Sequence, residues 1–111
     1  MPKVYVTQEV PTANYKSAER YGDIVFLCTT EISQSTGSLH NVKLVNNIRE
    51  RFKKYDPLID FIAPSGSPVI SCIVMAIARE KGSTFNFLKW NNREHDYAPV
   101  TINIEGDDYV Y

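Results

Sequence analysis

Hydrophobic and polar positions change their spacing several times along the chain, and each change predicts an element. Short apolar runs and alternating stretches rich in β-branched and aromatic residues, which are typical of strands, occupy residues 3–8, 23–28, 58–63, 84–90 and 97–104. Helical spacing of apolar residues occupies 14–22, 41–53 and 68–82. The expected order is therefore strand, helix, strand, helix, strand, helix, strand, strand.

The stretch 60–82 carries the strongest of these signals, because a strand, a turn and a helix follow one another without a gap. An apolar run enters the turn Pro64-Ser-Gly-Ser-Pro68, and a second apolar run of helical length follows it. Ser67 suits the N-cap of this helix, Pro68 its first position and Gly82 its stop. Apolar residues cover nearly the whole circumference of the helix, so we expect it to be the most buried helix of the chain.

Three further segments carry predictions about position in the fold. The run 23–28 is continuously apolar after its first residue, a pattern typical of a central strand covered on both faces. Residues 91–96 are turn formers, so the last two strands should form a β-hairpin, and Pro99 places the final strand at an edge or a bulge because proline cannot donate to a ladder. The polar loop 29–41 is long enough to be functional or mobile, and 105–111 is an acidic and aromatic tail.

Alternation of strands with helices implies parallel strands joined by right-handed crossovers, and the final pair adds an antiparallel strand. The expected fold class is therefore a small Rossmann-like α/β domain, with a mostly parallel sheet, helices and a C-terminal antiparallel hairpin. No repeat, low-complexity segment or linker interrupts residues 1–111, so we expect a single domain. A domain of this size often gains stability from self-association, and we expect a homodimer.

Composition and charge narrow the setting. The 111 residues are 43% hydrophobic and 23% charged with a net charge of −1, which argues against binding to bulk nucleic acid or to an anionic membrane surface. We expect a cytoplasmic protein, because no apolar leader pattern follows residue 2 and no stretch reaches membrane-spanning length. Cys28 and Cys72 lie within predicted apolar elements, so we expect both to be small core residues in a reduced compartment in preference to a disulfide.

In parallel α/β sheets, ligands bind beyond the carboxyl ends of the strands. The residues that follow the predicted strands there, and that form the candidate ligand-binding set, are Thr7, Thr29, Ser65, Gly66, Ser67, Lys89, Trp90 and Arg93. A nucleotide or another small phosphorylated ligand suits this set, with phosphate on the backbone N–H groups of 65–69, charge from Lys89 or Arg93, and a base stacked on Trp90. The simpler interpretation makes 64–68 a tight turn, Trp90 a core or interface residue and the two cations solvated.

Catalysis has less support in the sequence. Ser65 or Ser67 as a nucleophile would need His40 or His95 as its base, and both histidines lie in polar segments where solvated side chains are usual. Two histidines without clustered carboxylates or cysteines argue against a metal site, and no cofactor motif is present. Any enzyme built on this chain would be a metal-independent phosphodiesterase.

The turn Pro64-Ser-Gly-Ser-Pro68, followed by Phe87-Leu-Lys-Trp-Asn91 and Tyr97-Ala-Pro-Val-Thr-Ile102, resembles short proteins of unassigned function encoded by tailed bacteriophages. The layout also resembles, at fold level, the CARF-type domains that sense cyclic oligonucleotides in bacterial immunity, typically as dimers. These resemblances imply a phage protein in the host-cell cytoplasm that sequesters or interferes with a host nucleotide signal. The alternative is a ligand-free interaction module for a host protein or a second subunit, whose contact surface would comprise Trp90, Tyr97, Tyr109 and Tyr111.

Overall fold

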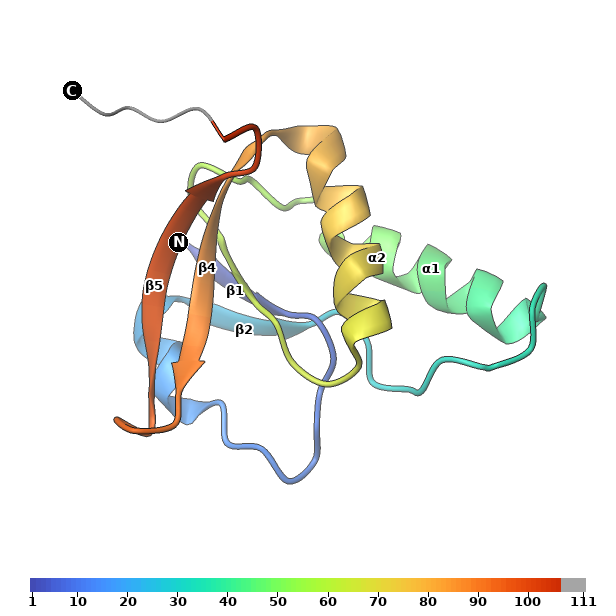
Figure 1. The fold of residues 1–111 in the computed structure, drawn as a ribbon, viewed down its shortest axis with the longest axis horizontal. Coiled ribbons are helices and arrows are strands. Elements are labelled where there is room, and N and C mark those ends of the chain that lie inside the picture. Colours follow the sequence, from blue (N-terminus) through green and yellow to red (C-terminus); the bar gives the residue numbers. More distant parts are fainter. Residues whose placement is uncertain (107–111) are drawn as a thin grey trace.

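A five-stranded sheet in the order β2-β1-β3-β4-β5 forms the middle layer of the protein (Figure 1). The computed structural model describes residues 1–106. Its elements are β1 (Lys3–Val6), η1 (Lys16–Tyr21), β2 (Asp23–Phe26), α1 (Leu39–Phe52), β3 (Phe61–Ala63), α2 (Pro68–Ala78), η2 (Arg79–Lys81), β4 (Thr84–Asn91) and β5 (Asp96–Asn103). The strands β1 to β4 run parallel and β5 pairs antiparallel with β4, which confirms the predicted fold class.

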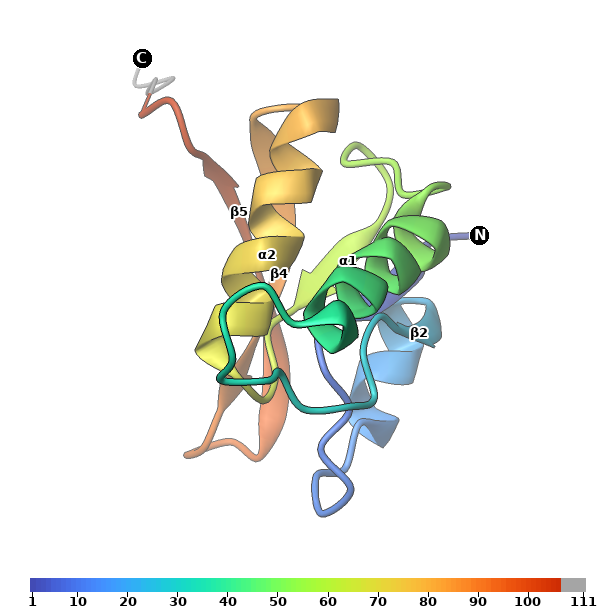
Figure 2. The same cartoon turned by 90° about the vertical axis from the view of Figure 1, so that its right-hand side faces the viewer.

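The two long helices share one face of the sheet, as Figures 1 and 2 show from two sides. Tyr5 of β1, Phe52 of α1 and Val74 of α2 belong to one buried cluster on this face. The 3₁₀ helix η1 covers the other face, where its Ala18 meets Val4 in a second cluster. Side chains of β1 enter both clusters because successive residues of a strand point to opposite faces.

The positions of β1 and β2 reverse one prediction. The apolar run that ends in β2 was expected to form a central strand, but β2 lies at the edge of the sheet and pairs only with β1. All four of its residues are exposed or half-buried. The interior positions belong to β1, β3 and β4. Apolar content in 23–28 instead reflects burial after the strand, because Leu27 and Cys28 are buried in the α1 face of the core.

The helix α2 begins as predicted, and one side of it is exposed. Ser67 is the N-cap and Pro68 the first helical residue. The buried residues of α2 are Ile70, Val74, Ile77 and Ala78, which makes it more buried than α1. The helix lies in an outer layer and its far side, which includes Val69 and Cys72, is exposed, so the prediction that Cys72 is a core residue is wrong. Cys28 is buried as expected, and both thiols are free.

The amphipathic helix α1 follows the predicted pattern and begins two residues earlier than expected. Leu44, Ile48 and Phe52 form its buried stripe. The loop before it makes its own hydrogen bonds: the Asn41 side chain accepts from Ser33 N at 2.7 Å and donates to Ser33 O at 2.9 Å. An amide that closes a loop in this way replaces the backbone partners that secondary structure would supply.

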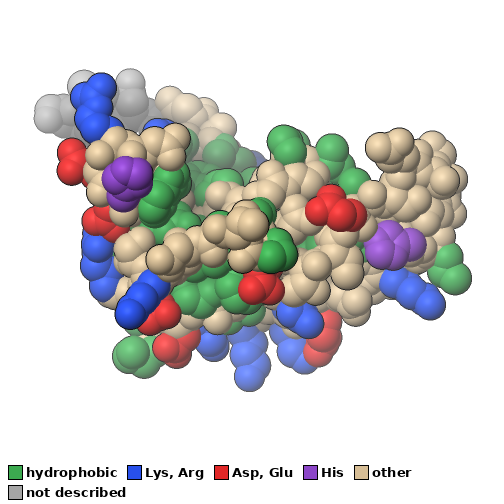
Figure 3. Space-filling view, turned by 90° about the horizontal axis from the view of Figure 1, so that it is seen from below, with side chains coloured by type: hydrophobic (Ala, Val, Ile, Leu, Met, Phe, Trp, Pro, Cys, Tyr) green, Lys and Arg blue, Asp and Glu red, His purple; other side chains and the backbone are tan. Residues whose placement is uncertain are grey.

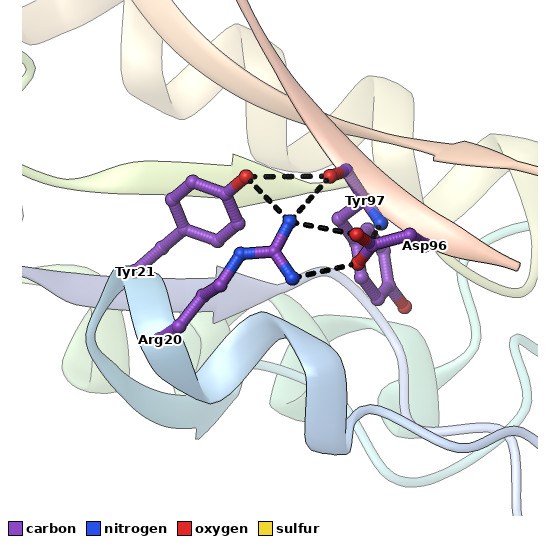
Figure 4. Close-up of polar contacts among 4 residues, drawn as sticks. All are labelled: Arg20, Tyr21, Asp96 and Tyr97. Carbon is purple, nitrogen blue, oxygen red and sulfur yellow. Dashed lines mark hydrogen bonds and ion pairs between the residues drawn. The ribbon is translucent and has the colours of Figure 1, made fainter. Parts of the chain in front are cut away.

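The free edge of β5 is protected against pairing with another strand. Ile104 N donates toward β4, to Ser83 O at 2.8 Å. Every second residue of β5 before Ile104 points its N–H toward β4 in the same way, so the backbone nitrogens of the residues between them, including Pro99, face the open edge. The predicted edge position of Pro99 is therefore confirmed. Farther along this edge, the carbonyl of Tyr97 accepts from Arg20 Nη2 and from the Tyr21 hydroxyl, each at 3.3 Å (Figure 4). Proline and side chains on an edge strand are common devices that prevent aggregation.

Candidate functional site

The loops that follow β1 and β3 meet at the point where the order of the parallel strands reverses. Thr7, which directly follows β1, is 1% exposed. Its hydroxyl donates to Ser65 O and accepts from Ser65 N, both at 2.8 Å. Because the Thr7 proton is committed to that carbonyl, the Ser71 hydroxyl on α2 is the donor in the 3.1 Å contact with Thr7. The backbone of Ser65 is therefore held from both sides.

Gln8 fills the rest of this junction. Its amide Oε1 accepts from Ser67 N at 2.6 Å, and its Nε2 donates to Thr30 O at 2.9 Å, so one buried side chain joins the loops after β1, β2 and β3. Gly66 has φ +75°, and a Cβ built on it would overlap the Gln8 side chain. We call residues 64–68, with the side chains of Thr7 and Gln8 bonded to them, the locked turn. Two backbone N–H groups of the candidate phosphate-binding segment, on Ser65 and Ser67, already have partners inside the protein.

A cavity of about 400 Å³ opens beside the locked turn, on the η1 face of the sheet. We call it the aromatic pocket, and its lining includes Asn14, Tyr15, Pro64, Ser65, Trp90 and Tyr97. It brings together two members of the predicted set, Ser65 and Trp90, from the ends of β3 and β4. No charged side chain lines it in the described part of the chain. Its chemistry is therefore that of aromatic rings, an amide and hydroxyls.

Trp90 forms one accessible wall of the aromatic pocket. The side chain is 38% exposed, and its ring meets Tyr97 edge to face with centroids 5.0 Å apart. The indole Nε1 donates to Asn92 Oδ1 at 2.7 Å, so the polar end of the ring is satisfied by the hairpin turn. An exposed indole face whose N–H is already bonded offers stacking and apolar contact to a ligand.

Tyr15 orients the hydroxyl of Ser65. The Tyr15 oxygen accepts from Val10 N at 2.8 Å and lies 2.8 Å from Ser65 Oγ. The alternative acceptor for its proton, Gln8 O, is farther away at 3.4 Å. Donation from Tyr15 to Ser65 is therefore favoured, and it leaves the Ser65 proton available to a group in the pocket.

The phenol of Tyr97 is uncharged at neutral pH. Burial, followed by the neighbouring Tyr15, raises the pKa of Tyr97 above its ordinary value of 10.0. A neutral phenol keeps its proton and can donate it. The pocket therefore offers hydroxyl groups and no fixed charge.

An ion pair on the η1 side holds the wall that carries Tyr97. Arg20 of η1 binds Asp96 through two parallel contacts, Nη1 to Oδ1 at 3.0 Å and Nη2 to Oδ2 at 2.8 Å, and Asp96 also accepts from Tyr97 N (Figure 4). Hydrogen bonding from Arg20 lowers the pKa of Asp96 and raises that of Arg20. Arg20 also lies 4.8 Å above the Tyr21 ring centroid. These contacts fasten the start of β5 to η1, so the two sides of the pocket are tied together.

The remaining members of the predicted set lie elsewhere. Lys89 precedes Trp90 on β4 and its side chain points to the opposite face of the strand, but both residues line a neighbouring groove together with Phe87 and Val100. Arg93 is exposed in the hairpin turn. Thr29 lines a separate small cavity on the α1 side of the sheet. Figure 3, which views this end of the molecule, shows Lys and Arg side chains mainly along the rim. The cations expected to accompany Trp90 are therefore not in the pocket.

Sequence reasoning missed three residues that shape this end of the sheet. Tyr15 and Asn14 lie in the segment 14–22, for which the sequence predicted only a helix, and Gln8 lies at the end of the predicted strand 3–8. Two signals were available: Gln8 lies two residues after the end of β1, and Tyr15 precedes a short helix that must cross the sheet end to reach β2.

No histidine contacts a candidate nucleophile within residues 1–106. His40 Nε2 lies 2.6 Å from Glu31 O, and the His95 ring lies beside Trp90 with centroids 6.5 Å apart. The two histidines lie far apart on the face drawn in Figure 3. A search of the same range finds no group of three or more His, Cys, Asp or Glu side chains arranged to hold a metal ion. Nor does any helix there combine the length and hydropathy that crossing a membrane requires.

Comparison with known proteins places the chain among bacteriophage proteins. The family model described as phage Pam3 gp32-like protein matches residues 2–104. No curated protein and no solved structure matches the chain. The matched range includes the residues of both the locked turn and the aromatic pocket. The chain therefore belongs to the phage Pam3 gp32-like protein family.

Proposed function

We propose that this phage protein binds a nucleotide through its base, which enters the aromatic pocket and stacks on Trp90. The observation that carries the proposal is the convergence of Trp90, Tyr97, Tyr15 and Ser65 around one cavity of about 400 Å³. Small-molecule sites are typically ~300–1,000 Å³, mostly apolar, and carry a few polar groups that fix orientation. Stacking on aromatic side chains contributes roughly 1–3 kcal/mol per base.

The hydrogen-bonding groups of the pocket suit a base better than a phosphate. Ser65 presents its proton to the cavity, since its oxygen is engaged by Tyr15 at 2.8 Å, and ring nitrogens and carbonyls of bases are acceptors for it. A phosphate would enter a pocket without a cation and next to backbone N–H groups that Thr7 and Gln8 already occupy. The phosphate of the ligand therefore points outward, toward solvent and the hairpin turn that carries Arg93.

Membership of a phage family suggests that the bound nucleotide comes from the host cell. A protein that holds a host nucleotide signal lowers the free concentration of that signal without any catalytic step. Sequestering a host nucleotide signal is therefore the specific role that we propose. It suits a site that offers aromatic and hydroxyl groups and in which no histidine contacts Ser65 within residues 1–106. The phosphodiesterase alternative has no such supporting contact in that range.

The test uses the single tryptophan of the chain as its own probe. Trp90 fluorescence is titrated with adenosine, guanosine, cytidine and uridine and with their 5′-monophosphates, and calorimetry measures the affinity of any ligand that responds. We expect a saturable change for at least one base, with nucleoside and nucleotide bound within about tenfold of each other because the phosphate contributes little (a tenfold ratio is about 1.4 kcal/mol).

Matched serine substitutions separate the pocket from the rest of the surface. Ser65→Ala removes the proton donor and should weaken the responding ligand at least fivefold, whereas Ser35→Ala, an exposed serine in the loop before α1, should leave the affinity unchanged. Flat titrations with all eight compounds would overturn the proposal. So would equal affinity after Trp90→Ala by calorimetry.

A homodimer remains our proposal for the assembly, and the edge of β5 restricts its form. Pro99 and the Arg20 and Tyr21 contacts to Tyr97 O occupy that edge, so a dimer would form through a surface other than a continued sheet at β5. In the alternative function, an interaction module, Tyr97 contributes little surface because it is 8% exposed. Tyr109 and Tyr111, the other members of that predicted surface, lie outside the described residues.

A further inference from the structure

We infer that a second, smaller cavity, between the end of β2 and α1, binds a tetrahedral oxyanion such as inorganic phosphate. The cavity measures about 60 Å³ and is lined by Leu27, Cys28, Thr29, Thr30, Leu44, Asn47 and Arg51. It lies on the α1 face of the sheet, whereas the aromatic pocket lies on the η1 face, so the inference does not rest on the proposed nucleotide site.

Arg51 supplies the charge, and the backbone fixes where that charge lies. Its Nη1 donates to Phe26 O at 2.9 Å, at the end of β2. A guanidinium has five N–H donors, so one such bond anchors the group and leaves others for a ligand. The planar fork suits two oxygens of a phosphate or sulfate.

No carboxylate neutralises Arg51 within residues 1–106. Three other arginines there are paired: Arg20 with Asp96, Arg49 with Glu80 and Arg79 with Glu105. None of the side chains that line the cavity is acidic. Arg51 is therefore an anchored cation that lines a cavity and has no carboxylate partner there, so an oxyanion in the cavity could pair with its charge.

The remaining lining fits the other oxygens and limits the size of the ligand. Two threonine hydroxyls and the Asn47 amide can donate at the rim, while Leu27 and Leu44 close the base and are buried. A water needs roughly 10–15 Å³ of such volume, so 60 Å³ holds about four to six water-sized groups. That matches a free tetrahedral ion and excludes a nucleoside. Thr29, a member of the predicted ligand-binding set, would then serve this separate ion.

The test measures binding of inorganic phosphate to the full chain at constant ionic strength, with sodium chloride as the balancing salt. Calorimetry and the thermal unfolding midpoint are followed in the unaltered protein and in Arg51→Gln. Arg93→Gln is the matched control, because it removes the same charge from an exposed position in the hairpin turn. We expect saturable phosphate binding that Arg51→Gln weakens at least tenfold and that Arg93→Gln changes less than twofold.

A second variant guards against misfolding of the first. Thr29→Val leaves Arg51 in place and should weaken phosphate about tenfold (about 1.4 kcal/mol), because the lost hydrogen bond is made to a charged group. A phosphate response no larger than that to chloride, or equal affinity in Arg51→Gln and the unaltered protein, would overturn the inference. Tighter binding of glycerol phosphate than of inorganic phosphate would overturn the assignment to a free ion.

Discussion

The locked turn and the aromatic pocket are neighbours at the same end of the sheet, share Ser65, and differ in what they leave unsatisfied. In the turn, the N–H groups of Ser65 and Ser67 are bonded to Thr7 and Gln8. In the pocket, the Trp90 face is half-exposed and the Ser65 proton has no committed acceptor. A strand-turn-helix junction is therefore not by itself a ligand site, because the protein's own side chains can complete it.

The difference follows from burial. Backbone N–H groups shielded from water must find partners, and Thr7 and Gln8, which are 1% and 4% exposed, are placed to supply them. The pocket lies at the rim between η1 and the hairpin, where solvent can satisfy the same needs. Polar groups therefore remain available to a ligand in the pocket, where the folded chain does not use them for its own hydrogen bonds.

The largest expected effect comes from opening the locked turn with Gly66→Ala. The new Cβ would overlap Gln8, and the residue would have to keep a φ of +75°. We expect a loss of about 3 kcal/mol in the free energy of unfolding, roughly 1–2 from the backbone and the rest from displacing Gln8, measured by urea denaturation. Gly37→Ala is the control, because its φ is +74° and nothing lies within 4 Å of the added Cβ. Equal losses in the two variants would show that Gln8 does not lock the turn.

Gln8→Leu should destabilise the protein by about 2 kcal/mol and leave the shape of the aromatic pocket unchanged. Leucine occupies a similar volume and leaves Ser67 N and Thr30 O without partners in a buried junction. Chemical denaturation measures the loss, and amide hydrogen exchange at Ser67, whose N–H loses its acceptor, should accelerate. An unchanged free energy of unfolding would mean that water replaces the amide, and the contrast between the two regions would then disappear.

Trp90→Ala should show the opposite balance between stability and binding. The side chain is 38% exposed, so its removal should cost only about 1 kcal/mol of stability while weakening a stacked ligand at least tenfold. Thermal unfolding and calorimetry on the same preparation give both numbers. A stability loss as large as that of Gly66→Ala would identify Trp90 as a core residue, the simpler interpretation of the sequence.

The ion pair that holds the pocket wall predicts a small effect of acid. The folded pKa of Asp96 lies below its ordinary value of 3.8 because Arg20 binds the carboxylate, so the stabilisation is complete above that value and is lost as pH falls through the lowered pKa. Asp96→Asn should therefore lower the unfolding midpoint slightly at pH 7 and reduce its dependence on pH below 4. Both partners are solvent-exposed enough that the shift should be smaller than that of Trp90→Ala. An unchanged acid dependence in Asp96→Asn would exclude this contact as a support of the pocket.

Local signals in the sequence predicted the fold well where an element depends on its own residues. Ser67 and Pro68 define the start of α2, and the turn formers of 91–96 define the hairpin. Position within the sheet was less accessible, because an apolar run such as 23–28 reports burial and not the number of neighbouring strands. The exposed side of α2 was missed for a similar reason: apolar residues around a helix do not say how many neighbours cover it.

The candidate site divides in the same way. The rule of strand ends brought Ser65 and Trp90 to one pocket, while Lys89 projects to the other face, as its position next to Trp90 on a strand could have indicated. Tyr15 comes from a crossover whose path no local pattern gives. Arg51 lies near the end of α1, and its role depends on a contact with β2 that is 25 residues away in sequence.

Ser67→Asp should have the smallest effect, and it tests the contrast most directly. The Ser67 side chain makes no cap hydrogen bond that the substitution would remove, and aspartate also suits an N-cap, so we expect a change within about 0.5 kcal/mol in stability. If a phosphate bound at the locked turn, as the sequence alone suggested, the new carboxylate would repel it and binding of a nucleoside monophosphate would be lost. With Gln8 already on Ser67 N and the base in the aromatic pocket, nucleotide affinity should instead stay within about twofold of the unaltered protein. Calorimetry with a nucleoside and its monophosphate separates the two cases, because repulsion at the turn would weaken only the monophosphate.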